Sequence, residues 1–340
     1  MRSKYIHIAL ITMVSWITMS CEHKDLCYLH NEHAHRYHIR VNADYRCVWE
    51  ETYTGTDWKA EWPTNYLPYE SLLPSLPTGL RVVNTSLDGR SDIHNLPAKG
   101  GVVNLYQGVN DLLFYNNDTE YILFSRDNND ASTRATTRSR TRASYTSSKF
   151  ANEGEETVNA PDMLYANFID DYVVEKQLEP EDIDVTLHPL VFTYKIRYEF
   201  EAGLEYVSLA RGALTGMARS VLLNTGETSV EPATILFDCE MTDFGSRAVV
   251  NSFGVPDFPN NYFGTRGTNK HALNLELMLR NGKTITFDYD VTDQVAKQPH
   301  GGVIVVKGIV VEKDDGVSGS GAFDVEVKDW GEYEDIYLPL

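Results

Sequence analysis

The sequence lacks the short motifs that carry the commonest catalytic and nucleotide-binding chemistry. It contains no Gly-x-Ser-x-Gly elbow, no His-Glu-x-x-His, no P-loop and no dinucleotide-binding glycine fingerprint. Its 4 cysteines include no Cys-x-x-Cys pair, which disfavours a structural zinc site and thioredoxin-type redox chemistry. We therefore expect a protein that is not an enzyme and that needs neither a cofactor nor a metal.

Basic residues are also scarce. The chain has 30 Lys and Arg against 49 Asp and Glu, and its formal net charge is -19. Such a chain is repelled by phosphate backbones, so nucleic acid is not an expected partner. Hydrophobic residues make up 42% of the 340 residues, which is enough for packed cores in about two domains.

The sequence has no apolar run long enough to span a membrane. Its most informative apolar run, a short one, lies near the start of the chain. It extends from Ile6 to Ile17, after a basic start and shortly before Ser20 and Cys21. A membrane-spanning helix needs about 20 residues, so this run is too short to span a bilayer. Its layout is typical of a secretory signal that is cleaved before a cysteine. We expect residues 1–20 to be a lipoprotein signal peptide and Cys21 to be lipidated. The alternative is an ordinary signal peptide with a chance cysteine.

The other cysteines have separate expected roles. Cys27 and Cys47 are candidates for a disulfide in an oxidising compartment. Cys239 lies in an apolar stretch and is expected to behave as a small buried residue. Residues 21–38 are polar and rich in histidine, and we expect them to form a tether. The histidine spacing fits no zinc pattern, so no metal site is predicted there.

Strand patterns dominate the remainder. Short apolar runs closed by Gly or Asn clusters predict strands in the first half, and alternation of apolar with polar residues predicts half-buried strands in the second. Unbroken apolar runs predict a strand buried on both faces. These strands are expected at 80–83, 101–106, 111–115, 121–124, 192–200, 273–279, 285–291, 303–311, 323–327 and 335–338. Two tandem β-sandwiches account for them best.

Two local predictions concern turns and helices. A three-residue loop, Arg280-Asn281-Gly282, is preferred over a two-residue turn, because it pairs Leu277 with Ile285 and keeps the two apolar faces aligned. Residues 160–176 are predicted to form a helix, since Phe168 and Tyr172 recur at helical spacing after a Pro-Asp start.

Residues 131–152 contain no acid and are rich in Ser, Thr and Arg. One interpretation is a solvated linker between domains. The other is a segment sensitive to a trypsin-like protease, because exposed arginines in flexible chain are preferred targets. The candidate cleavage residues are Arg134, Arg138, Arg140 and Arg142. The expected domains are an N-terminal sandwich at 39–130, a linker at 131–160 and a C-terminal sandwich at 161–340.

Several segments together resemble a known family. The segments at 21–28, 110–120, 213–218, 253–254, 290–294 and 327–330 are similar to those of a Bacteroidales lipoprotein family, the domain of unknown function 5119. That family is similar to the fimbrillin-like pilin and anchor subunits of Bacteroidales fimbriae. The resemblance implies two transthyretin-like β-sandwiches with at most one or two short helices.

The resemblance also implies a location and partners. The expected location is the outer membrane, where a lipid anchor holds the protein, exposed at the cell surface. The expected function is that of a fimbria (pilus) anchor, accessory or subunit, which contacts other fimbrial or surface subunits through strand addition. The alternative is a surface lipoprotein that binds a glycan or another host ligand, with Trp58, Trp62 and Tyr66 as stacking platforms.

Overall fold

The computed structural model describes residues 36–46, 74, 76–126, 133–177, 179–260, 270–317 and 333–336. Over these residues the protein is built of β-strands, with two short α-helices, α5 (Thr292–Ala296) and α6 (Lys313–Val317), and one 3₁₀ helix, η2 (Leu204–Tyr206). The all-β class predicted from the sequence is confirmed. In the described part of the chain, no helix is both long enough and apolar enough to cross a membrane.

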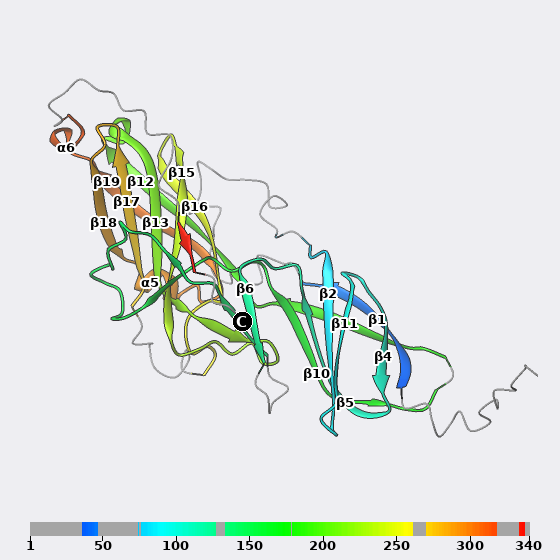
Figure 1. Cartoon of the computed structure of the whole chain (residues 1–340). Helices are drawn as coiled ribbons and strands as arrows, with labels where there is room; N and C mark the ends of the chain where they lie inside the picture. The colour runs from blue at the N-terminus through cyan, green and yellow to red at the C-terminus, as the bar shows by residue number, and fades with distance from the viewer. Residues whose placement is uncertain are drawn as a thin grey trace, which may run out of the picture.

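The N-terminal sandwich lies on the right of Figure 1. Its strands are β1 (Arg36–Tyr45), β2 (Gly79–Ser86), β3 (Ser91–Pro97), β4 (Gly100–Tyr106), β5 (Gly108–Asn116), β10 (Tyr165–Val174) and β11 (Glu181–Pro189). They pair in the order β3-β2-β5-β10-β11-β1-β4. β10 and β11 pair only through Tyr165 with Pro189 and Ala166 with His188. The sheet therefore divides between these two strands into the two layers of a sandwich.

Alternation along each strand builds the core of this sandwich. On β1, Tyr37, Ile39 and Val41 are buried, while the residues between them are exposed. Because successive side chains of a strand point to opposite faces, this pattern directs one face into the core and the other into solvent. The buried side chains meet Leu80 and Phe114 of the opposite layer. Each such apolar side chain contributes about 1.5–3 kcal/mol by leaving water.

The C-terminal sandwich lies on the left of Figure 1. Its main strands are β12 (Phe192–Ala202), β13 (Val207–Ala218), β15 (Pro232–Thr242), β16 (Gly245–Ser252), β17 (Ala272–Leu279), β18 (Thr284–Asp290) and β19 (Gly302–Val310). They pair in the order β18-β17-β13-β15-β16-β12-β19, and β9 (Glu156–Val158) pairs with β15 outside this path. β15 pairs with β13 through its first part and with β16 only through residues 240–242, so it passes from one layer to the other.

The turn between β17 and β18 confirms the predicted register. Leu277 pairs with Ile285, and Gly282 has a φ of 81°. Glycine adopts such a left-handed conformation without steric cost, which explains why the three-residue loop closes here.

A small third sheet joins the two sandwiches. It pairs β6 (Ile122–Arg126) and β14 (Ser220–Leu222) on either side of β7 (Thr133–Thr137). Beneath it lies a separate apolar cluster to which both sandwiches contribute, including Val83, Tyr115, Val221 and Phe253. β5 contributes side chains to two cores. Leu112 and Phe114 pack in the N-terminal core, and Leu113 and Tyr115 pack in the cluster at this junction. The two sandwiches are thus packed into one elongated body (Figure 1).

The helix predicted at 160–176 is wrong, because Tyr165–Val174 form strand β10. A β-bulge between Ile169 and Tyr172 inserts one extra residue into the strand opposite β5. Such an insertion breaks the period of two and moves the apolar residues to spacings of three and four. The sequence pattern of this strand therefore imitates that of a helix.

Sheet membership differs from the expected domain boundaries. β10 and β11 follow residue 161, yet they pair with β5 and β1 of the N-terminal sandwich. The expected linker contains β7, β9 and a two-residue strand, β8 (Arg140–Thr141). Its side chains include the fully buried Ala135 and Val158. The physical reason is that this segment packs on both sandwiches instead of crossing solvent between them.

Candidate interaction surfaces

The arginines singled out from the sequence lie on strands or pack against them. Arg134, Arg138 and Arg140 are half-buried, and Arg142 is buried. Arg134 donates a hydrogen bond to the Ser220 hydroxyl at 3.0 Å. Arg142 donates to the Gly212 carbonyl at 3.4 Å. These contacts limit the access of a protease, and cleavage at these arginines stays a prediction.

The acidic C-terminal segment docks on the Arg-rich segment. Strand β20 (Glu334–Asp335) pairs with β8 in an antiparallel arrangement. The Arg140 guanidinium lies 3.0 Å from the Asp335 carboxylate and 4.4 Å from the centre of the Tyr333 ring. Burial raises the pKa of Asp335, but hydrogen bonds from Arg140 and Asn159 and the charge of Arg140 together outweigh it and hold the pKa below its usual value. The acid-free composition of one segment thus complements the acids of another.

The segment that follows Arg142 covers the outer face of the C-terminal sheet. The Ser144 hydroxyl contacts both Arg211 on β13 and Glu276 on β17. Arg211 Nε lies 2.8 Å from Glu276 Oε1, and both side chains are buried. Asn274, on the same face of β17, is 2% exposed. The alternating polar residues of β17, which the sequence pattern places in water, are therefore buried by this segment.

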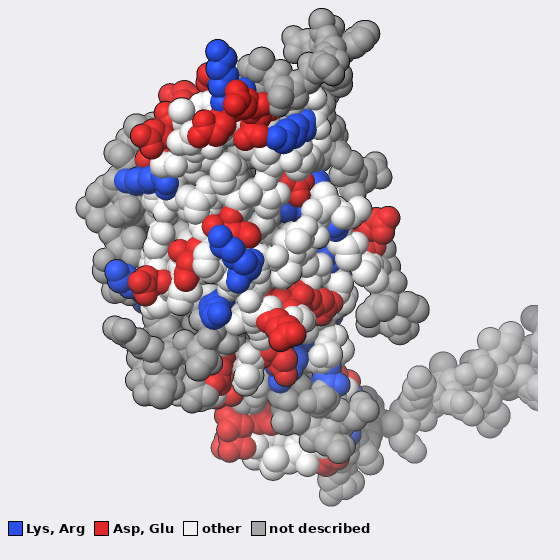
Figure 2. Space-filling view, turned by 90° about the vertical axis from the view of Figure 1, so that its left-hand side faces the viewer, with Lys and Arg blue, Asp and Glu red and all other residues white. Residues whose placement is uncertain are grey.

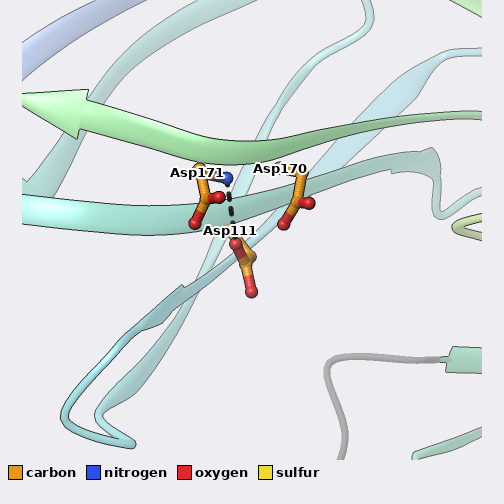
Figure 3. A group of neighbouring side chains, drawn as sticks. All are labelled: Asp111, Asp170 and Asp171. Atoms are coloured by element: carbon orange, nitrogen blue, oxygen red, sulfur yellow. Dashed lines mark hydrogen bonds between the residues drawn. The ribbon is translucent and has the colours of Figure 1, made fainter.

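Three carboxylates meet at the bulge of β10. Asp170 and Asp171 face Asp111 of β5, and one oxygen of each lies within 4.8 Å of the others (Figure 3). The Asp171 backbone N–H donates to the Asp111 carboxylate at 3.2 Å. Burial raises the pKa of Asp111, the bond from Asp171 opposes this, and Asp170 adds to the increase. Carboxylates are ligands that hard cations prefer, but Asp170 and Asp171 are exposed.

Charge elsewhere on the surface is mixed. Figure 2 shows acidic side chains gathered toward the upper and lower parts of the view, with lysines and arginines interspersed between them. On the described part of this face the basic side chains form no continuous patch. This pattern fits the strong net negative charge of the chain.

The strand edges are the surfaces on which another strand can pair. In the N-terminal sandwich, among the described residues, β10 beyond Ala166 and β11 before His188 lack a strand partner on their facing sides. In the C-terminal sandwich, β18 and β19 stand at the two ends of the strand order. Unpaired backbone N–H and C=O groups on an edge are a template for another chain.

Buried and half-buried titratable groups support packing. Burial lowers the pKa of His271 to about 4, outweighing Thr215 and Asp290, which raise it. Burial likewise lowers the pKa of His300 to about 4, and its ring stacks on Phe192 with a centroid distance of 4.3 Å. Burial raises the pKa of the Cys239 thiol well above its usual value, which keeps the thiol protonated and poorly nucleophilic.

Several predicted sites lie outside the described residues. They are the lipidation residue, the two cysteines of the candidate disulfide and the aromatic residues of the alternative function: Cys21, Cys27, Cys47, Trp58, Trp62 and Tyr66. Lipidation and the disulfide therefore stay predictions.

A family model matches the middle of this chain. The model described as "Domain of unknown function (DUF5119)" matches residues 71–238. Over these residues the chain is similar to the DUF5119 family. This DUF5119 region runs from the N-terminal sandwich through the junction to β15, so it includes strands of both sandwiches.

Two further comparisons extend this result. The chain is 27% identical over 205 residues to a protein of Bacteroides ovatus provisionally named fimbrium anchoring subunit Fim4B. That match covers 59% of this chain and 56% of Fim4B, so it spans little more than half of that relative. A crystal structure from Bacteroides ovatus, provisionally described as an adhesin, has a TM-score of 0.56 and 21% identity. It matches 81% of this chain and 92% of its own, and it shows that the two share a fold.

Sequence reasoning missed the docking of the C-terminal segment on β8 and the burial of the outer face of β17. One sequence feature could have indicated both contacts. A segment with arginines and no acids is expected to pair with acidic residues elsewhere in the chain, and here it contacts Asp335 and Glu276. The sequence does not show which acids these are, because each lies more than a hundred residues away along the chain.

Proposed function

We propose that this chain is a lipid-anchored structural protein of the cell surface that serves a fimbria (pilus) as an anchor, an accessory protein or a subunit. The observation that carries the proposal is the likeness to Fim4B over 205 residues, since that protein is named for anchoring a fimbrium. The name denotes a structural role, which agrees with the absence of catalytic motifs from the sequence.

The architecture supports a role in assembly. Two sandwiches packed through a shared apolar junction form an elongated body whose strand edges are suited to pairing with a neighbouring subunit. In strand addition, backbone hydrogen bonds supply affinity, and pockets for alternate side chains supply register. The edges of β10 and β11, together with those of β3 and β4 at the ends of the strand order, are the candidates in the N-terminal sandwich.

Deletion of the chain tests the fimbrial role. When the protein is deleted from cells that normally produce it, the cells should lose fibres or show fibres of altered length or attachment in electron micrographs. Expression of the protein from a plasmid should restore the original fibres. If fibres are unchanged and the protein binds a defined glycan tightly, the glycan-binding alternative replaces this proposal.

Replacement of the lipidated residue tests the anchor. Cys21→Ala should move the protein from the outer-membrane fraction to the soluble fraction, while mass spectrometry of the unaltered protein should show lipid on its first mature residue. Cys239→Ala is the matched control and should leave the protein in the membrane. A Cys21→Ala variant that stays in the membrane, together with an unaltered protein without lipid, contradicts the anchor.

A further inference from the structure

The outer edge of β19 is closed by two glutamine side chains. Val303 N–H donates to Gln298 Oε1 at 2.7 Å, and Gln298 Nε2 donates back to the Val303 carbonyl at 2.9 Å. Gln294 makes the same pair of bonds with Val305, at 2.9 and 3.0 Å. Each amide side chain therefore satisfies the donor and the acceptor that a neighbouring strand would otherwise satisfy.

The match between helix and strand is geometric. The two glutamines are four residues apart, which corresponds to about 6 Å along a helix. Val303 and Val305 are two residues apart, which corresponds to about 6.6 Å along a strand. Gln294 lies on α5 and Gln298 lies two residues beyond its end at Ala296. The two amides therefore follow the outward-facing backbone groups of β19 in the direction opposite to the strand.

The surrounding residues hold this arrangement in place. Val295, between the glutamines on α5, is fully buried in the C-terminal core. Gly302 has a φ of 151°, and a Cβ at this position would lie 1.8 Å from Gln298 Oε1. The bonded position of Gln298 therefore requires glycine at residue 302.

The part of the edge beyond the glutamines is blunted in another way. The pairing of β12 with β19 is irregular after Tyr198, and Gly308 there has a φ of 76°. Lys307 and Gly308 are both exposed. Bulges and exposed lysines are devices that discourage the pairing of an edge strand with another chain.

This edge needs protection because of its sequence. Val303, Ile304, Val305 and Val306 form an unbroken apolar run in an edge strand. A segment of this kind, when its backbone groups are unpaired, is a site of strand pairing and aggregation.

We propose that Gln294 and Gln298 form a cap that closes the β19 edge against strand pairing with a second copy of this chain. The cap excludes β19 as a pairing edge and leaves the other strand edges for partners. The inference does not depend on a fimbrial role, because it concerns the isolated chain.

Hydrogen exchange in the unaltered mature chain is the first test. The Val303 and Val305 amides should exchange slowly, although they lie on the outer side of an edge strand. Gln298→Leu should speed exchange at Val303, and Gln294→Leu should speed it at Val305. Each change should be roughly 2- to 12-fold, which corresponds to a net hydrogen bond of about 0.5–1.5 kcal/mol. Rapid exchange of both amides in the unaltered chain overturns the proposal.

Self-association is the second test. The Gln294→Leu/Gln298→Leu double variant keeps the side-chain size and should show a larger mass than the unaltered chain by light scattering. Gln177→Leu is the matched control, because Gln177 bonds to the His38 carbonyl far from β19, and its mass should not change. A folded double variant with unchanged mass overturns the proposal.

Gly302→Ala provides a second test of the cap if the double variant does not fold. The added Cβ displaces Gln298 without placing a new apolar side chain at the cap. The variant should show faster exchange at Val303 and greater association. Unchanged exchange and unchanged mass in this variant overturn the proposal.

Discussion

Removal of the carboxylate from the buried ion pair on β13 and β17 should destabilise the protein strongly. Arg211 and Glu276 are 5% and 2% exposed, and Arg211 Nε lies 2.8 Å from Glu276 Oε1. Glu276→Leu leaves a buried guanidinium without its anionic partner, which costs about 3–5 kcal/mol. Because domains are stable by about 5–15 kcal/mol, this cost is a large fraction of the total.

The same reasoning predicts that loss of both charges is tolerated. The double variant Arg211→Met/Glu276→Leu should lie within about 1 kcal/mol of the unaltered protein, because apolar side chains of similar volume replace a desolvated pair. The interaction energy between the two positions should then amount to several kcal/mol in a double-mutant cycle.

Urea unfolding followed by circular dichroism measures these differences. With a slope of about 3 kcal/mol per M, Glu276→Leu should lower the midpoint by about 1–1.7 M. Glu240→Leu is the matched control, since Glu240 pairs with Arg247 on an exposed surface, and its cost should stay below about 1 kcal/mol. A Glu276→Leu cost no larger than that of Glu240→Leu refutes the burial of the pair beneath the segment that contains Ser144.

Two further predictions concern pH and proteolysis. Folding lowers the pKa of His271 from 6.5 to about 4, so the unfolded state binds more protons than the folded state between these pH values. The contribution of His271 to the free energy of unfolding should therefore be complete above pH 6.5. It should fall by about 3 kcal/mol as the pH drops toward 4. His271→Leu should remove this part of the slope in urea unfolding at pH 7.5, 5.5 and 4.5, and an unchanged slope contradicts the assignment. Asp335→Ala should speed tryptic cleavage after Arg140, because it frees the Arg140 guanidinium and loosens β20 from β8. Asp182→Ala is the control: it removes an exposed ion pair with Arg40 and should not change the cleavage rate. Equal cleavage rates in the two variants would show that the docked C-terminal segment does not shield Arg140.

The sequence predicts the strands whose apolar residues alternate without interruption. β12, β17 and β18 lie where alternation places them, and the turn at Gly282 has the predicted register. These elements are predictable because one buried face determines both the strand and its register. β10 is not, because the bulge before Tyr172 breaks the period on which the prediction depends.

The Arg-rich segment shows a different limit. Composition indicates a solvated linker, but Arg142 is buried and Ser144 contacts a buried ion pair. The partners of this segment come from β13, β17 and the C-terminus, so its burial depends on contacts that are distant in sequence. The glutamine cap has the same origin, since Gln294 and Gln298 gain their role only when the chain returns as β19.

The fimbrial role is tested most directly by the composition of isolated surface fibres. Fibres sheared from cells that produce the protein should be separated by gel electrophoresis without boiling, and each band should be identified by mass spectrometry. We predict that this chain occurs in denaturant-resistant species together with another fibre subunit. Recovery of the chain only as a free monomer, absent from every fibre species, would contradict the proposed function.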